Sequence, residues 1–144
     1  MKTIELPNVT LCCITNRDPE GHKKALNESS KVIEWGAKKI IWDESCTSID
    51  AWNFEVIYKL PEYVETDFAM LVHPDGYVVR PELWNPLWLE FDYIGAPWPL
   101  PQDNYSYRDE EGEIQRVGNS VSLRSKKLME LVASRPKEWF WEQK

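Results

Sequence analysis

A short turn that carries a carboxylate follows the most apolar stretch of the chain. The stretch runs over residues 68–72 and stops at His73-Pro74-Asp75-Gly76. An unbroken apolar run is typical of a strand covered on both faces, as in a parallel α/β sheet. Such sheets bind ligands outside the carboxyl ends of their strands, which is where Asp75 would lie. Gly76 would let the backbone turn there. A carboxylate at this position can hold a divalent cation, which can in turn hold phosphate oxygens.

Two plainer interpretations of the same residues stay open. An Asp-Gly pair is a common turn between strands and needs no ligand. His73 could reach the same cleft as Asp75, or its ring could be satisfied by the backbone of the turn. The chain has no Cys-x-x-Cys pair, no phosphate loop of the Walker type and no Gly-x-Ser-x-Gly elbow. Its two histidines are His22 and His73, so a Ser-His-Asp mechanism has few candidate residues.

The first part of the chain predicts a strand, a helix and a second strand. Residues 9–15 are apolar and predict a buried strand. Residues 20–35 predict a helix that Asp18 caps at its start and Gly36 ends as a C-cap. Residues 39–42 predict the next strand. This order begins a βαβ unit and predicts the α/β class.

The rest of the chain predicts shorter elements around one long loop. Residues 49–60 predict a helix capped by Ser48, with a strand over residues 54–58 as the rival interpretation. Residues 97–115 are polar and acidic and predict a loop, which in a compact domain is usually functional or disordered. The other predicted elements are a strand over 68–72, a short extension over 77–79, a short helix over 81–89, strands over 93–94 and 117–123, and a helix over 126–133 capped by Ser125.

Composition limits the classes of function. The 144 residues predict a single domain spanning residues 1–144. A formal net charge of -7 argues against a nucleic-acid backbone binder, which normally has a basic face. No apolar run approaches the roughly 20 residues that span a bilayer, and no signal peptide is recognisable, so we expect a cytoplasmic protein without a membrane span. Cys12, Cys13 and Cys46 are not expected to form a disulfide framework, and Cys12 and Cys13 are expected to be small core residues.

A set of short motifs falls in one order over nearly the whole chain, from about residue 6 to residue 131. The motifs are Pro7-Asn8-Val9-Thr10, Thr66-Asp67-Phe68, Asp75-Gly76, Trp84, Asp92-Tyr93-Ile94-Gly95-Ala96-Pro97-Trp98, Arg116-Val117-Gly118-Asn119 and Ser122-Leu123-Arg124-Ser125. Together they resemble the DUF5672 family, a group of glycosyltransferase-like proteins. The motifs over residues 92–98 and 122–125 are specific in combination, whereas Asp-Gly alone is weak.

The resemblance implies a GT-A-like nucleotide-sugar-binding fold, compact or truncated, with a mostly parallel central sheet flanked by helices. It implies transfer of a sugar from a nucleoside-diphosphate sugar to an acceptor hydroxyl, such as that of a glycan, and it assigns no catalytic residue. A divalent metal, Mn²⁺ or Mg²⁺, and backbone donors would stabilise the leaving diphosphate. The implied site residues are Thr15, Asn16, Arg17 and Asp75 for the nucleotide, Asp75 with His73 as a second candidate for the metal, and Trp98, Gly118, Asn119 and Arg124 for the sugar or acceptor.

Departures from the family pattern motivate an alternative function. The family motif usually reads Gly-Asn-Gly-Gly-Phe-Ser-Leu-Arg, whereas residues 118–124 are one residue shorter and lack the paired glycines that let a backbone approach a sugar closely. The family's carboxyl-terminal segment with an acidic pair is also expected to be missing. The alternative is a catalytically inactive carbohydrate-binding or homo-oligomeric structural domain on the same fold. The aromatic residues 139–141 would then be an oligomer contact.

Overall fold

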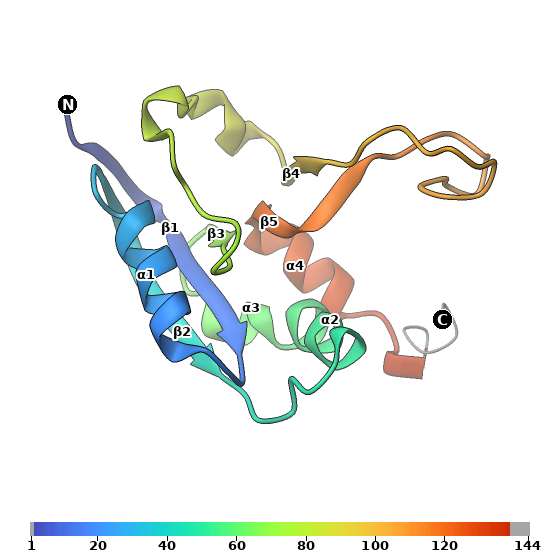
Figure 1. Ribbon diagram of the computed structural model, residues 1–144, viewed down its shortest axis with the longest axis horizontal. Coiled ribbons are helices and arrows are strands. Elements are labelled where there is room, and N and C mark those ends of the chain that lie inside the picture. The colour runs from blue at the N-terminus through green and yellow to red at the C-terminus, as the bar shows by residue number, and fades with distance from the viewer. Residues whose placement is uncertain (1, 139–144) are drawn as a thin grey trace.

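The computed structural model describes residues 2–138, and for Asn119 it describes the backbone alone. Residues 139–141, which the sequence suggests as an oligomer contact, lie outside the described part. The described chain is a mixed α/β fold, in which a five-stranded sheet has helices on both faces (Figure 1). No helix in residues 2–138 has the length and apolar character needed to cross a membrane.

The predicted order of strands and helices is largely confirmed. α2 is a helix, so the rival strand over residues 54–58 is wrong, and α4 has the predicted bounds. The elements in chain order are β1 (Ile4–Thr15), α1 (Pro19–Ser29), β2 (Ile33–Trp42), α2 (Ile49–Tyr58), α3 (Leu60–Tyr63), β3 (Phe68–Leu71), η1 (Pro81–Leu83), η2 (Pro86–Glu90), β4 (Tyr93–Pro97), β5 (Val117–Ser125) and α4 (Lys126–Ala133).

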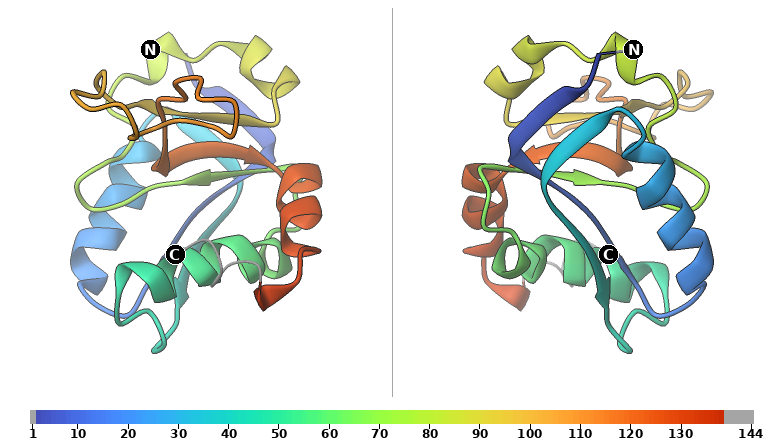
Figure 2. Two further views of the ribbon diagram at one scale, coloured as in Figure 1. Left: turned by 90° about the vertical axis from the view of Figure 1, so that its right-hand side faces the viewer. Right: turned by 90° about the vertical axis from the view of Figure 1, so that its left-hand side faces the viewer.

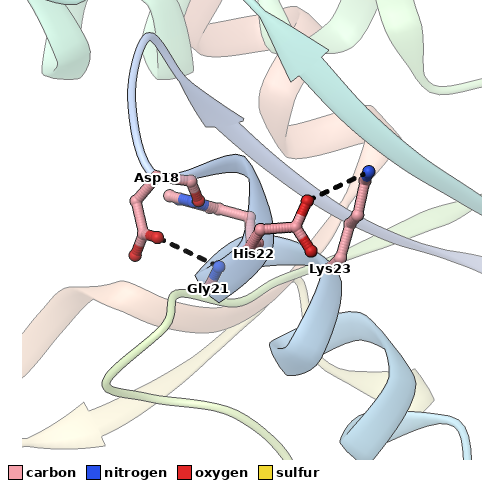
Figure 3. A network of polar contacts seen from close by, with 5 residues as sticks. Asp18, Gly21, His22 and Lys23 are labelled. Atoms are coloured by element: carbon pink, nitrogen blue, oxygen red, sulfur yellow. Dashed lines mark hydrogen bonds and ion pairs between the residues drawn. The ribbon is translucent and has the colours of Figure 1, made fainter.

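Helix α1 begins where predicted and ends earlier. Asp18 adopts a left-handed conformation with φ of 52°, and its Oδ1 accepts a hydrogen bond from the Gly21 N–H at 3.0 Å (Figure 3). Ser29 ends the helix, although the apolar residues 32–33 continue the helical spacing. Those residues instead lead into β2, where Ile33 pairs in parallel with Ile4. The partner strand therefore outweighs the local helical pattern.

Gly36 lies inside β2 and is not the predicted C-cap. β1 pairs with β2 through Leu6 opposite Trp35 and then through Thr10 opposite Ala37, so residues 7–9 bulge out of the ladder across from Gly36. A Cβ atom on Gly36 would lie 2.1 Å from the Pro7 carbonyl oxygen. The glycine is required because a bulged backbone crosses directly over it.

The sheet is mixed, which corrects the prediction of a mostly parallel sheet. Its strand order is β2-β1-β3-β5-β4. β1 pairs in parallel with β2 and β3, whereas β5 pairs antiparallel with both β3 and β4. β4 and β5 are antiparallel because the chain returns through residues 98–116 as a long hairpin between them, and a hairpin cannot join parallel strands.

Different helices cover the two faces of the sheet (Figure 2). On one face Ala25 and Leu26 of α1 pack on Leu11 and Cys13. On the other face α2, α3 and α4 pack on the alternate residues of β1 and β3, with Leu60 and Leu71 fully buried. All three cysteines are free and buried, and the predicted core position of Cys12 and Cys13 is confirmed. The run over β3 is apolar throughout because both of its faces are covered.

The chain between β3 and β5 contains little regular structure. Residues 77–79 form no strand, and the helix predicted over residues 81–89 is two short 3₁₀ turns, η1 and η2, each beginning at a proline. Residues 98–116, close to the loop predicted over residues 97–115, extend away from the sheet beyond β4 and β5 (Figure 1). These segments border the carboxyl end of β3, where the candidate site lies.

Candidate functional site

The carboxyl ends of β1 and β3 lie side by side because the two strands are parallel neighbours. Leu71 pairs with Cys12, and the Val72 N–H donates to the Cys12 carbonyl at 3.0 Å. The chain therefore leaves β3 beside the last residues of β1, which ends at Thr15. From β1 the chain moves to β2 on one side and later to β3 on the other. Such a change of direction between neighbouring parallel strands is the place where open α/β sheets bind ligands.

Asp75 lies in a tight turn directly after the carboxyl end of β3. The backbone N–H of His73 donates to the Gly76 carbonyl at 2.8 Å, and the Gly76 N–H donates back to His73 at 3.1 Å. The carboxylate of Asp75 is exposed. A Cβ atom on Gly76 would lie 2.5 Å from Cγ2 of Val121, so the turn is pressed against β5. The turn is thus held by backbone bonds and packing, and the carboxylate is left facing solvent.

His73 is half-buried between the turn and helix α2. Its ring centroid lies 5.2 Å from that of Trp52, and its Nε2 atom is buried with no hydrogen-bond partner among the described residues. Burial lowers the pKa of His73, while the Ser120 backbone and the Asp75 carboxylate oppose that change. The ring is therefore neutral near pH 7, which leaves an imidazole nitrogen that can accept a hydrogen bond or a metal.

The end of β1 carries three of the residues predicted for the nucleotide, namely Thr15, Asn16 and Arg17. The Thr15 hydroxyl donates to the Arg17 carbonyl at 2.8 Å and accepts from the Arg17 N–H at 3.1 Å, so it shapes the turn. Asn16 is half-buried and Arg17 is exposed. Of the three side chains, those of Asn16 and Arg17 are therefore better placed for a ligand than that of Thr15.

Trp52 joins the ends of the two strands. Its Nε1 donates to the Ile14 carbonyl at 2.9 Å, one residue before Thr15, while its ring contacts His73. The sequence did not single out this residue, because a tryptophan on an amphipathic helix looks like an ordinary core residue. Only the packing of α2 against β1 places it in the site.

Arg124 is a buried cation on β5, the strand that pairs with β3. It is 8% exposed, its Nε donates to Ser122 Oγ at 2.8 Å, and its guanidinium lies 5.2 Å from the Tyr93 ring centroid. Burial lowers the pKa of Arg124, and the Arg124 charge is one of the causes that lower the pKa of His73. Arg124 therefore brings positive charge close to His73 and the turn that carries Asp75.

Tyr93 connects Arg124 with the other residues predicted for the sugar side. Its hydroxyl donates to the Gly118 carbonyl at 2.7 Å. A Cβ atom on Gly118 would lie 2.8 Å from Nε1 of Trp98, whose ring centroid lies 4.6 Å from that of Tyr107 with the two rings tilted by 47°. The predicted residues Arg124, Gly118 and Trp98 thus form one row through Tyr93. The side chain of Asn119 lies outside the described part of the structure.

The side chains at the turn could hold a metal ion only together with ligands from a bound molecule. Among the described residues, no three His, Cys, Asp or Glu side chains could hold a metal together. Asp75 supplies one carboxylate, and His73 supplies the orphaned Nε2. Mg²⁺ in nucleotide sites is commonly held by one or two carboxylates together with substrate phosphates and water. The residues present therefore suit a cation that arrives with a diphosphate.

An acidic pair borders the site at the end of β2. The Asp43 N–H donates to the Thr15 carbonyl at 2.9 Å, and Asp43 Oδ1 accepts from the N–H and the hydroxyl of Ser45. Glu55 on α2 is 5% exposed, and its Oε2 has no hydrogen-bond partner in residues 2–138. Burial raises the pKa of Glu55, and the nearby Asp43 raises it further. The ionised form of Glu55 is thus disfavoured in the folded protein.

We expect Glu55→Gln to stabilise the protein at pH 8. The folded pKa lies above the unfolded value near 4.5, so the folded state binds more protons and stability falls as pH rises through the folded pKa. Removing the charge should gain about 1 kcal/mol at pH 8, the low end for an unsatisfied buried group, and nothing below pH 4. Urea unfolding at both pH values measures this, with exposed Glu62→Gln as the control. A loss of stability at pH 8 would contradict the account.

Comparisons with known proteins add one finding. No curated protein and no solved structure matches this chain. The profile of the DUF5672 family, described as a protein of unknown function, matches residues 55–144. That range contains β3, the Asp75 turn, β4, β5 and Arg124, and it is more than half of the chain. The chain therefore belongs to the DUF5672 family.

Proposed function

We propose that this protein binds a nucleoside-diphosphate sugar at the ends of β1 and β3 and transfers the sugar to an acceptor hydroxyl. The observation that carries the proposal is the junction itself. Two parallel strands end side by side where the chain changes direction. An exposed carboxylate and an imidazole lie in the turn after β3, and the charge of a buried guanidinium on β5 acts on that imidazole. This placement favours a ligand with a diphosphate group. We further propose that the domain is GT-A-like.

Each part of the donor has a counterpart in this arrangement. The diphosphate would lie near Arg124, whose guanidinium can bind phosphate oxygens. Asp75 and His73 would hold a shared Mn²⁺ or Mg²⁺, which would neutralise charge on the leaving diphosphate. The base would lie at Asn16 and Arg17.

The sugar side would follow the row of residues from Arg124 to Trp98. The ring of Tyr93 and the tilted rings of Trp98 and Tyr107 offer flat apolar faces, on which the C–H faces of a sugar ring can lie. Trp98 is 40% exposed, so part of its ring is open to a ligand. Gly118 lets the backbone approach closely at the same point.

The proposed reaction exchanges one bond at the anomeric carbon. The acceptor oxygen forms a bond to that carbon, while the bond from the carbon to the diphosphate oxygen breaks and the diphosphate leaves with the electron pair. The acceptor hydroxyl gives its proton to solvent or to the leaving diphosphate. Positive charge at Arg124 stabilises the charge that develops on the leaving diphosphate.

Isothermal titration with UDP- and GDP-sugars tests the proposal. We expect at least one donor to bind, and about a hundredfold more tightly with 1 mM Mn²⁺ than with chelator, because the cation bridges the diphosphate to Asp75. Sugar transfer to water or to an acceptor, measured by mass spectrometry, would then establish the activity. Absence of binding by any donor in either condition would contradict the proposal. Glycan-array binding in that case would favour the inactive carbohydrate-binding domain.

A further inference from the structure

An apolar hollow lies against the sheet, on the face that α1 partly covers. Its volume is about 280 Å³. Its walls come from β2, β3, β4 and β5 and from the segment that contains η1 and η2. Three indole rings, those of Trp35, Trp84 and Trp88, line it together with Met70, Ile94 and Leu123. We call this hollow the indole pocket.

The chemistry of the indole pocket favours an uncharged apolar ligand. Its side chains are almost entirely carbon, and Arg80 is the charged residue of the lining. Arg80 Nε is paired with Glu82 Oε1 at 2.8 Å, so its charge is already balanced. Trp84 and Trp88 meet edge to face at 5.2 Å and are half-buried, as is Trp35. An apolar ligand would cover ring surface that is now in contact with water.

The volume sets the size of that ligand. An apolar cavity of about 150 Å³ is large enough to bind benzene. At 280 Å³ the indole pocket is nearly twice that size, which suits two fused rings or a chain of about ten carbon atoms.

The indole pocket adjoins the turn that carries Asp75. Val121 lines the pocket, and the same side chain is pressed against Gly76, the residue after Asp75. Ser122 also lines the pocket and accepts the hydrogen bond from Arg124. A molecule in the pocket would therefore have one end beside the proposed diphosphate site.

We propose that the indole pocket binds the apolar body of the acceptor, which is an alcohol or phenol with about ten carbon atoms. The assignment as an acceptor site rests on the proposed glycosyl transfer, whereas the binding of an uncharged apolar group does not. The hydroxyl of such an acceptor would face the Val121 end, next to Asp75, and its rings or chain would lie among the three indoles.

The indole N–H signals in a ¹⁵N-correlated NMR spectrum test the binding residue by residue. The probe is 2-naphthol, titrated to about 1 mM. A dissociation constant of about 1 mM is the weakest affinity of interest for so small a ligand. We expect the signals of Trp35, Trp84 and Trp88 to shift, with those of Trp42 and Trp52 unchanged. Equal shifts at all indoles, or none, would overturn the proposal.

Variants that fill the pocket supply the control. Ala96 lines the pocket from β4 and is exposed, so Ala96→Phe can place a ring inside it. We expect binding to weaken about tenfold or more. Ala133→Phe on α4, on the opposite face, should bind as the original protein does. If Ala96→Phe loses the dispersed spectrum of a folded protein, Val78→Phe fills the pocket from another segment. Undiminished binding in a folded filling variant would place the probe elsewhere.

Donor titrations on the same samples separate the two proposals. Donor binding without any 2-naphthol shift would refute the indole pocket and leave the proposed transfer intact. A 2-naphthol shift without donor binding would support the apolar site and refute its role as an acceptor site. Binding of both, with formation of a naphthyl glycoside, would support the whole inference.

Discussion

Exchanging Asp75 for asparagine is expected to weaken binding of a nucleoside-diphosphate sugar in the presence of Mn²⁺ by about a hundredfold, or about 2.7 kcal/mol. The amide keeps the shape of the side chain and removes the negative charge that would hold the cation. The turn itself should persist, because it is closed by backbone bonds between His73 and Gly76. Calorimetry with Mn²⁺ and with chelator measures the effect. The loss should be confined to the Mn²⁺ condition.

Asp67→Asn is the matched control for this prediction. Asp67 is an exposed carboxylate just before β3, whereas Asp75 follows the same strand. Both variants change the net charge equally, so a general electrostatic effect would appear in both. We expect Asp67→Asn to bind the donor as the original protein does, and both variants to keep their stability within about 0.5 kcal/mol. Unchanged metal-dependent binding in Asp75→Asn would remove Asp75 from the site.

Local signals in the sequence predict the starts of the helices well. Ser48 Oγ accepts from the Ala51 N–H at 3.1 Å, and Ser125 Oγ accepts from the Leu128 N–H at 3.0 Å. Asp18 does the same for α1. A capping side chain and the N–H that it binds are three residues apart, so the information lies within a few residues of sequence.

The errors occur where a distant strand decides the structure. Residues 33–35 fit a helix by spacing and become a strand because β1 pairs with them. The single helix predicted over residues 49–60 divides into α2 and α3, and Pro61 lies in the first turn of α3, where its missing N–H costs nothing. The antiparallel direction of β5 is likewise set by the long hairpin through residues 98–116, and no local pattern encodes it.

The candidate site divides in the same way. Asp75 could be predicted because an apolar run, a carboxylate and a glycine are adjacent in sequence. Trp52 and Tyr93 could not be assigned roles, since each acquires its role from partners at least 20 residues away: Ile14 and His73 for Trp52, and Gly118 and Arg124 for Tyr93. The indole pocket combines residues from Ile33 to Leu123 and has no signature in any single segment.

Gly36→Ala should be the most destabilising small substitution in the sheet, at about 3 kcal/mol, the upper end of typical overpacking costs. Its new Cβ atom would lie 2.1 Å from the Pro7 carbonyl oxygen and 2.8 Å from the Pro7 carbonyl carbon. Both are backbone atoms, so the bulge over residues 7–9 or the β2 strand must move. Because β1 is the central parallel strand, paired on both sides, that movement would strain the strand that ends at the candidate site.

Gly112→Ala separates this steric effect from a general cost of replacing glycine. Gly112 has φ of +85° and open space where a Cβ atom would lie, so its substitution should cost about 1 kcal/mol through backbone conformation alone. Urea unfolding of both variants gives the comparison, with unchanged m-values expected. If Gly36→Ala costs no more than Gly112→Ala, the bulge yields freely and Pro7 does not fix the register of β1. A cost near 3 kcal/mol would instead show that the Pro7-Asn8-Val9-Thr10 motif and Gly36 act as one structural unit. That unit would then set where β1 ends, and hence where Asn16 and Arg17 lie.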